Sequence, residues 1–163
     1  MESFDKFSKA IEIKPDHYDA YFNWGVNLGN LGQTKSDAEA ENLYLQSFEK
    51  FRKVTEIKPD FQDAYNNWGA YLINLSKTKS GEEAKVLHLQ AFDKLKKVVD
   101  LGGSSYNLAC LNAVTKNSEE AFRVLETSLQ KNEITFENVE EDSDWDNLRK
   151  EPQYEKLKNL YSK

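Results

Sequence analysis

An internal repeat of 44 residues is the feature that most constrains how this chain can fold. Its two full copies run over residues 3–46 and 47–90, and 27 of the 44 aligned positions are identical. A third copy opens at Ala91 and is shorter. The identical segments include 12–16 with 56–60, 19–21 with 63–65, 23–25 with 67–69 and 34–36 with 78–80. Such self-similarity predicts stacked supersecondary units, each of which buries its apolar face on its neighbours.

The spacing of apolar residues in each copy predicts two helices. Pro15 and Pro59 end the helices before them, because the residue that precedes a proline is pushed out of the helical region. We expect Asp16 to cap the next helix. The predicted helices span residues 3–14, 17–33, 37–57, 61–77, 81–101, 105–116 and 118–131. The expected buried stripe of the helix at 37–57 is Leu43, Phe48, Phe51, Val54 and Ile57. In the helix at 17–33, the apolar residues Tyr21, Trp24, Leu28 and Leu31 fall on one face.

Two further patterns recur in both copies. The serines at 36 and 80 are each followed three residues later by a glutamate, which predicts a capping box at the start of the second helix. Gly25 and Gly69 lie near the middle of the first helices, where glycine costs about 1 kcal/mol relative to alanine. A glycine present in both copies at that cost predicts close approach by a neighbouring helix.

The segment from residue 132 to the C-terminus differs from the repeats because it is strongly acidic and still carries apolar residues. We expect it to dock as a cap on the end of the repeat stack, with a last helix from Pro152 to about Tyr161. The acidic residues are then a solvated face of this cap. The apolar residues expected to dock are Phe136, Val139, Trp145, Leu148, Tyr154, Leu157 and Leu160.

The charge balance argues against two classes of partner. The chain has 22 Lys and Arg against 28 Asp and Glu, a net charge of −6, with no basic stripe. We therefore expect neither nucleic acid nor an anionic membrane surface as a partner. No apolar run is long enough to cross a membrane, and no secretory signal is visible. The single cysteine agrees with a reducing compartment, so we predict a cytoplasmic location.

Residues that could carry chemistry are few. His17 begins one predicted helix and His88 lies within another, and no Cys-x-x-Cys or His-Glu-x-x-His spacing exists. Cys110 has no nearby base in the sequence pattern that would make it a nucleophile. Gly102-Gly103 lacks the Lys-Ser/Thr of a phosphate-binding loop. We therefore expect no enzyme activity, no cofactor and no metal.

The third copy carries a family resemblance. Its residues Tyr106, Asn107, Leu108, Ala109, Glu120, Ala121, Leu125 and Ser128 have the spacing of a tetratricopeptide repeat, whose usual period is about 34 residues. The two longer copies are similar to the same motif with about ten added residues around the Thr-Lys-Ser link. The chain thus resembles an elongated tetratricopeptide array with C-terminal capping helices. The resemblance implies an all-α, right-handed superhelical α-solenoid of antiparallel helix pairs.

The repeat frame divides the chain into an array over residues 1–131 and an acidic cap over 132–163. The array is expected to contain a half repeat at 3–15, long repeats at 16–59 and 60–101, and a short repeat at 102–131. The half repeat is a second helix without its first, so we expect the chain to be cut from a longer array. The other interpretation is that this helix buries its face elsewhere.

In tetratricopeptide arrays the first helices line a concave groove, so the resemblance implies a non-enzymatic scaffold that binds a peptide or partner segment there. Arrays that grip acidic C-terminal tails use lysine and arginine in this groove, whereas this chain has none at the matching positions. We therefore expect a neutral, apolar or mildly basic segment. The positions carried over are Asp19, Phe22, Asn23, Val26, Asn30, Asp63, Asn66, Asn67, Ala70, Asn74, Asn107 and Cys110.

Two alternatives stay open at this point. Asn23, Asn67 and Asn107 recur at one motif position and could form a ladder of amide contacts to a peptide backbone, or each could bond its own helix. The alternative function is self-association into a homo-oligomer through the unpaired N-terminal helix. Its predicted contact residues are Phe4, Phe7 and Ile11.

Overall fold

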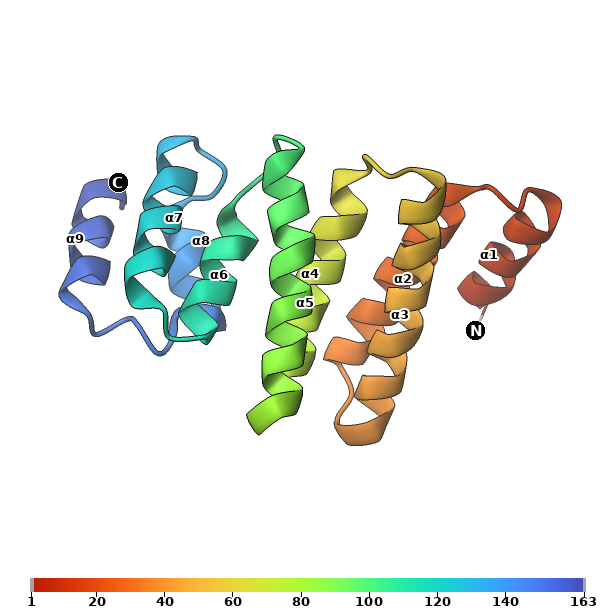
Figure 1. Ribbon diagram of the computed structural model, residues 1–163, viewed down its shortest axis with the longest axis horizontal. Coiled ribbons are helices and arrows are strands. Elements are labelled where there is room, and N and C mark those ends of the chain that lie inside the picture. Colours follow the sequence, from red (N-terminus) through yellow and green to blue (C-terminus); the bar gives the residue numbers. More distant parts are fainter. Residues whose placement is uncertain (1, 163) are drawn as a thin grey trace.

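The computed structural model describes residues 2–162, with side chains from Phe4 onward. All regular structure in this range is helical, without a strand (Figure 1). The elements are α1 (Glu2–Ile13), α2 (Tyr18–Gln33), α3 (Asp37–Ile57), α4 (Gln62–Ser76), α5 (Gly81–Asp100), α6 (Tyr106–Val114), α7 (Ser118–Gln130), α8 (Phe136–Glu141), a short 3-10 helix η1 (Ser143–Trp145) and α9 (Pro152–Tyr161).

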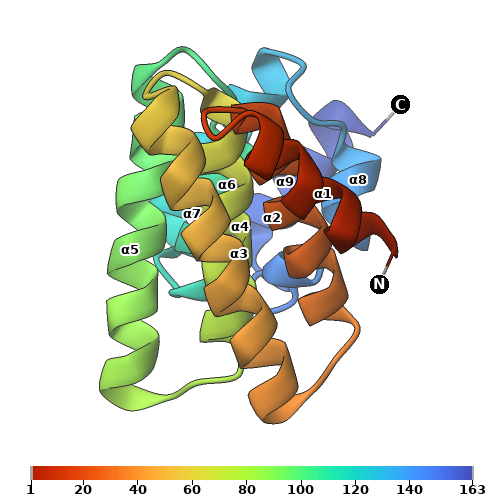
Figure 2. The same ribbon diagram turned by 90° about the vertical axis from the view of Figure 1, so that its right-hand side faces the viewer.

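The helices pack in sequential pairs, α2 with α3, α4 with α5 and α6 with α7, while α1 packs on α2. The first helices α2, α4 and α6 also contact one another in series, and α3 and α5 each contact the first helix of the next pair. Seen from the N-terminal end, α3 and α5 form one layer and α2 and α4 lie beside it (Figure 2). This arrangement is consistent with a helical repeat.

The predicted helix bounds in the repeat region agree with the structure to within two residues, but the predicted caps are wrong. Neither Ser36 nor Ser80 accepts a capping hydrogen bond with its side chain. In both copies the next residue has a positive φ, 52° at Asp37 and 58° at Gly81. The chain therefore enters the helix through a left-handed residue, whereas a capping box needs right-handed helical geometry there. Asp16 is also not the cap, since α2 begins after His17 without a side-chain bond.

The predicted close approach at the repeated glycines is confirmed. A Cβ on Gly25 would lie 2.9 Å from Cε1 of Phe51, and a Cβ on Gly69 would lie 2.5 Å from Cδ2 of Leu95. Phe51 and Leu95 occupy the same repeat position, so each second helix presses one large side chain against the glycine of its own first helix. A side chain at these positions would require Phe51 or Leu95 to move.

The tryptophan beside each glycine joins three helices. The rings of Phe4 and Phe7 in α1 stack on Trp24 with centroids 6.2 Å away, and Phe48 stacks on Trp68 at 6.3 Å. On each indole a lysine of the following helix also approaches the ring centroid, Lys50 at 3.7 Å and Lys94 at 4.3 Å. These aromatic and cation–π contacts repeat from unit to unit.

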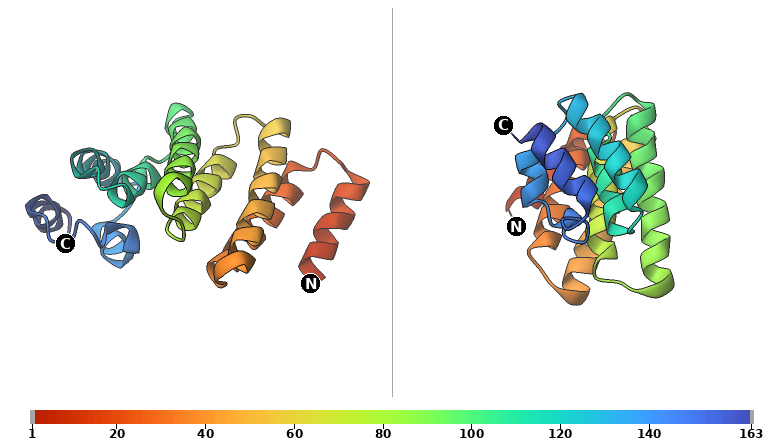
Figure 3. Two further views of the ribbon diagram at one scale, coloured as in Figure 1. Left: turned by 60° about the horizontal axis from the view of Figure 1, so that its bottom comes forward. Right: turned by 90° about the vertical axis from the view of Figure 1, so that its left-hand side faces the viewer.

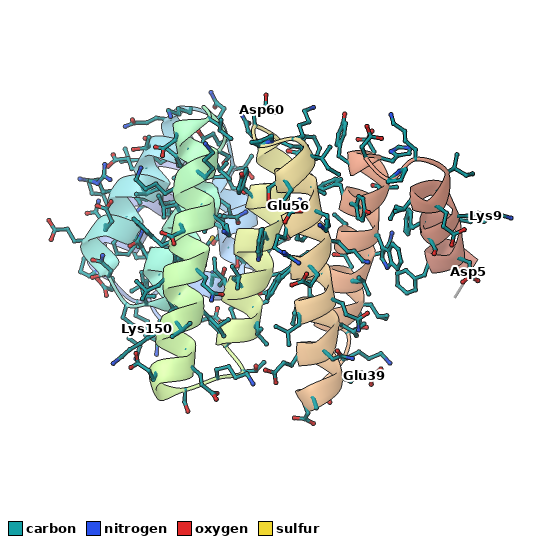
Figure 4. The ribbon with its side chains drawn as sticks, turned by 45° about the vertical axis from the view of Figure 1, so that its right-hand side comes forward. Asp5, Lys9, Glu39, Glu56, Asp60 and Lys150 are labelled. Atoms are coloured by element: carbon teal, nitrogen blue, oxygen red, sulfur yellow. The ribbon has the colours of Figure 1, made fainter. Side chains whose placement is uncertain are left out.

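The predicted buried stripe of α3 is confirmed in the middle of the helix and wrong at its end. Phe51 and Val54 are fully buried, but Ile57, in the last turn of α3, is 36% exposed. Leu31, in the last turn of α2, is also 36% exposed, whereas Leu28 is buried. Helix ends project beyond the neighbouring helix, which leaves apolar residues there without cover. Charged residues such as Glu39 and Glu56 of α3 point to solvent (Figure 4).

The C-terminal segment docks through its apolar residues, as predicted. Trp145, Val139 and Leu157 are fully buried, and the segment contacts both α6 and α7. Leu160 is the exception and is 56% exposed. Within residues 2–162, no helix has the length and apolar character that crossing a membrane requires.

Candidate functional site

The residues predicted to contact a partner lie mainly on α2 and α4, in two sets of five that are related by the 44-residue repeat. We call the surface formed by these ten residues the α2–α4 face. On α2, Asp19, Asn23 and Asn30 are exposed, and Phe22 and Val26 are half-buried. On α4, Asp63 is exposed, and Asn66, Asn67, Ala70 and Asn74 are half-buried. The structure therefore offers an equivalent carboxylate to solvent at two places one repeat apart, whereas the other four positions differ in residue or in exposure.

The amide side chains on this face do not form the uniform ladder that the motif position suggested. Asn67 donates to the carbonyl of Asp63 in its own helix at 2.8 Å, and Asn107 donates to Oδ1 of Asn66 at 2.9 Å. Asn23 is exposed and bonds no other described residue through its amide. The alternative interpretation, a bond to the residue's own helix, thus holds for Asn67. Of the three asparagines, only Asn23 has a side-chain amide without a bond to another described residue.

Asn30 serves the packing of α2 on α4. Its Oδ1 accepts a hydrogen bond from the Tyr71 hydroxyl at 2.7 Å. The same hydroxyl lies 3.3 Å from the carbonyl oxygen of Val26. Burial raises the pKa of Tyr71 to about 12, with a further contribution from nearby Tyr44, so this hydroxyl stays a donor at neutral pH.

Phe22 belongs to the α2–α4 face and also packs between the two long repeats. Its ring lies edge-on to Phe61, with centroids 5.1 Å apart, and tilted against Phe51 at 6.1 Å. Tyr18 meets the same Phe61 ring at 5.4 Å. The Phe22 ring is therefore held in place on several sides and presents a rigid apolar edge beside the Asp19 carboxylate.

At α6 the predicted site is covered by the C-terminal segment. Cys110 is only 1% exposed, and its Sγ lies 3.6 Å from Oδ2 of Asp142. The Tyr106 hydroxyl donates to the same oxygen at 2.8 Å. The part of the segment that packs on α6 is η1, and Figure 3 shows the C-terminal segment, in blue, at the opposite end of the molecule from the N-terminus. Cys110 is therefore not available to a peptide, because the segment that sequence reasoning treated as an end cap also folds over this face.

The buried contact around Cys110 is electrostatically unusual. Burial raises the pKa of the Cys110 thiol, and the carboxylates of Asp142 and Asp144 raise it further, so the thiol is protonated and a poor nucleophile. Burial also raises the pKa of Asp144, and an ion pair with Lys77 at the end of α4 acts in the opposite direction. The C-terminal segment is thereby tied to the second repeat as well as to the third.

Within the described residues, possible metal-ligand atoms converge at one place, on Cys110, Asp142 and Asp144, all within 4.8 Å of one another. Each carboxylate already has a protein partner, since Tyr106 donates to Asp142 and Lys77 pairs with Asp144. A protonated thiol completes the group. These contacts account for the cluster as a packing junction between α6 and η1.

The N-terminal residues predicted for self-association are half-buried. Phe4, Phe7 and Ile11 all lie on the α1 face that meets α2. Phe4 and Phe7 correspond to Phe48 and Phe51 one repeat later, which are 9% and 0% exposed. The N-terminal copies are less covered because, within the part of the chain that the structure describes, α1 packs mainly on α2, whereas α3 packs between α2 and α4.

Two grooves between successive repeats were missed by sequence reasoning. The α3–α5 groove has a volume of about 370 Å³ and the α5–α6 groove about 600 Å³. The α3–α5 groove is lined by Glu41, Leu45, Leu75, Lys79, Glu82, Glu83, Val86 and Leu87. The α5–α6 groove is lined by Lys85, His88, Leu89, Phe92, Leu111, Asn112, Val114, Thr115 and Lys116. The shorter third copy was the available signal, because a short unit leaves part of a long neighbour uncovered.

Comparison with known proteins does not identify a family. No model of a known protein family matches the chain, and no curated protein matches it.

Proposed function

We propose that this chain is a tetratricopeptide-like, right-handed α-solenoid that acts as a non-enzymatic interaction scaffold, with the α2–α4 face as the wall of its concave groove. The repeated helix pairs, their glycine contacts and the sequence motif support this fold assignment. The partner would be an extended segment of another protein that is neutral, apolar or mildly basic.

The observation that carries the proposal is the duplication of an accessible carboxylate on the α2–α4 face. Asp19 and Asp63 are exposed at one repeat position, whereas of the asparagines that follow, Asn23 is exposed and Asn67 bonds its own helix. An extended peptide that crosses both first helices would meet the same carboxylate at each and the free amide of Asn23 on α2. Carboxylates favour a basic partner through electrostatic complementarity, while Phe22 and Val26 supply apolar contact.

The first experiment is a competition between peptides of matched length and apolar content that carry lysine, glutamate or neither. Binding to the full chain is measured by fluorescence anisotropy. The labelled lysine peptide is expected to be displaced by unlabelled lysine and neutral peptides and not by the acidic peptide, and the double variant Asp19→Lys, Asp63→Lys should weaken binding of the lysine peptide by about tenfold or more. Displacement by the acidic peptide alone would reject the proposal.

A matched control separates the α2–α4 face from overall charge. Glu49 and Asp93 are exposed residues one repeat apart on α3 and α5. The double variant Glu49→Lys, Asp93→Lys changes the net charge by the same amount on the other layer. It loses a surface ion pair between Glu49 and Arg52, which is worth about 1 kcal/mol or less. Peptide affinity is expected to change by less than about threefold in this control, because long-range charge effects are screened by salt.

A second function, self-assembly through α1, is favoured by the incomplete cover of Phe4 and Phe7. A second copy that packs on α1 would bury these rings as Phe48 and Phe51 are buried one repeat later. Light scattering over a range of concentrations tests this. Self-assembly through α1 would be supported if the chain associates, if Phe7→Ser abolishes the association, and if Leu160→Ser, at the other end of the chain, leaves it intact. A concentration-independent monomer mass would reject it.

A further inference from the structure

We propose that the α5–α6 groove is a second docking site, and that its occupant is an amphipathic helix of another protein with acidic residues beside its apolar stripe. This inference does not depend on the function proposed for the α2–α4 face, because the groove lies between α5 and α6 and uses none of the same residues.

The groove exists because helix length changes at this step. α4 has 15 residues, whereas α6 has 9 and ends at Val114. The lower end of α5 runs on past the turn between α6 and α7 (Figure 1). The stretch of α5 from Gly81 to Phe92 is about 18 Å long at 1.5 Å per residue, which is enough to accompany about three turns of a docked helix.

The wall of the groove is apolar and accessible. Leu89 is 68% exposed and Phe92 is 45% exposed, although both lie in the middle of α5. Leu111, which is 4% exposed, and half-buried Val114 complete the apolar surface from the α6 side. A contiguous apolar surface of this kind marks an interaction site, since apolar residues on a surface are otherwise scattered. A volume of about 600 Å³ is in the range of known binding pockets.

The charge of the lining selects the partner. Lys85 and Lys116 lie at the groove and no carboxylate is among its lining residues, although the whole chain has a net charge of −6. Lys85 has a partner in Glu82 at 3.5 Å, but both side chains are more than 70% exposed, so this pair is weak. A helix with an apolar stripe and flanking glutamates or aspartates matches both the wall and the lysines.

The α3–α5 groove differs from the α5–α6 groove in the charge of its lining residues. It lies at the equivalent place one repeat earlier, but Glu41, Glu82 and Glu83 line it, and its Lys79 already pairs with Glu41 at 2.7 Å. The same acidic helix would meet repulsion there. Leu45 of this groove, which is 50% exposed, occupies the repeat position of Leu89 and supplies the control substitution.

The probes for the test are two labelled helical peptides of about 14 residues, with leucine or phenylalanine at i, i+3, i+4 and i+7. One carries glutamates beside the stripe and its twin carries lysines at the same places. Fluorescence anisotropy with the full chain is expected to show micromolar binding of the acidic peptide, weakened by salt, and at least about tenfold weaker binding of the lysine twin.

Three variants locate the site. Leu89→Ser and Lys116→Glu are each expected to lower the affinity for the acidic peptide by about tenfold, whereas Leu45→Ser should change this affinity by less than about twofold. All three side chains lie on the surface, and thermal unfolding verifies that each variant folds. The pair Asp19→Lys, Asp63→Lys should not reduce acidic-peptide binding, which separates this site from the α2–α4 face.

Four results would overturn the inference. They are the absence of binding by the acidic peptide, equal binding of the two twins, an equal loss in Leu45→Ser and Leu89→Ser, and a concentration-dependent rise in molar mass that Leu89→Ser removes. The last result would assign the groove to a second copy of the chain and exclude the acidic partner helix as its occupant.

Discussion

The junction of α3 with the second long repeat, called here the first step, and the junction of α5 with the short third repeat, the second step, share several repeat residues and differ in what covers them. Phe48 of α3 and Phe92 of α5 occupy one repeat position, yet Phe48 is 9% exposed and Phe92 is 45% exposed. At the first step Tyr44 is 4% exposed and packs against Tyr71 of the next first helix, with ring centroids 6.0 Å apart. At the second step His88 stands at the position of Tyr44, and its Nε2 lies 2.9 Å from the Ser76 hydroxyl of its own repeat.

This difference shows that the next repeat along the chain decides whether a residue of the preceding repeat is buried. The long second repeat extends over α3 and covers Tyr44 and Phe48 at the first step, where a groove of about 370 Å³ remains. In the short third repeat α6 ends at Val114, before it reaches the first turns of α5, and the second step has the larger groove of about 600 Å³. An apolar pattern copied from one unit to the next therefore becomes core in one place and exposed surface in another.

The largest effect is expected on the other side of α6, which the C-terminal segment covers. Trp145→Ala removes a side chain that is 0% exposed and packs on Phe122 at 6.0 Å. We expect a loss of about 3 to 5 kcal/mol in the free energy of unfolding, because a large cavity is left. Urea unfolding measures this, and the Cys110 thiol should then react with a thiol reagent that it resists in the parent protein.

The control for that prediction lies on α5, across the α5–α6 groove from α6. Leu89→Ala truncates a side chain that is 68% exposed, so its stability change should stay below about 0.5 kcal/mol. If Trp145→Ala left stability and thiol protection unchanged, the C-terminal segment would not cover α6 in solution.

The next effect compares the two phenylalanines directly. Phe48→Ala should cost about 3 kcal/mol, because the ring stacks on Tyr44 at 6.4 Å and on Trp68 at 6.3 Å. Phe92→Ala should cost less than about 1 kcal/mol, because that ring faces the open groove. Denaturant unfolding of both variants measures the difference, and equal losses would show that the second step is closed in solution.

A smaller effect is expected from a hydrogen bond that only the first long repeat has. The Ser47 hydroxyl donates to the Gly25 carbonyl at 2.7 Å, and Ala91 stands at the equivalent position of the second. Ser47→Ala should cost about 1 kcal/mol, since an alanine fits this position and leaves neither a clash nor a large cavity. A loss above about 2 kcal/mol would indicate a packing defect instead of a lost bond.

The smallest effect concerns pH at the second step. Burial lowers the pKa of His88 below 6.5, so the unfolded chain binds a proton more readily than the folded one. The stability that His88 contributes is complete above pH 6.5 and falls as the pH drops through the lowered folded pKa. Between about pH 7.5 and pH 5 the parent protein should lose slightly more stability than His88→Gln, as measured by thermal unfolding. A larger loss in His88→Gln would reverse the sign and contradict this account.

Much of the local structure could be predicted from the sequence. Helix bounds followed from apolar spacing and from the repeated prolines, and the close approach at Gly25 followed from a glycine that both copies retain. These are local features, and each copy is a second test of the same pattern. The capping boxes were wrong because a Ser-x-x-Glu spacing does not reveal that the residue between cap and helix, Asp37 or Gly81, is left-handed.

The candidate site was predictable only in part. Repeat positions selected Asp19 and Asp63, which are exposed, but also Cys110, which the C-terminal segment buries. The bonds of Asn30 to Tyr71 and of Asn107 to Asn66 join different helices, so no local pattern reports them. The α5–α6 groove was missed because its residues looked like a copy of the buried stripe one repeat earlier.

The sequence by itself determined the repeat frame, the helices and which face of each helix is apolar, because periodicity and side-chain identity act over a few turns of the chain. Tertiary structure alone decided which apolar residues are covered. Coverage depends on how far the neighbouring helix extends and on where the C-terminal segment folds back, and both bring together residues that are far apart in the chain. Phe48 and Phe92 have the same side chain at the same repeat position, and only their neighbours make one core and the other surface.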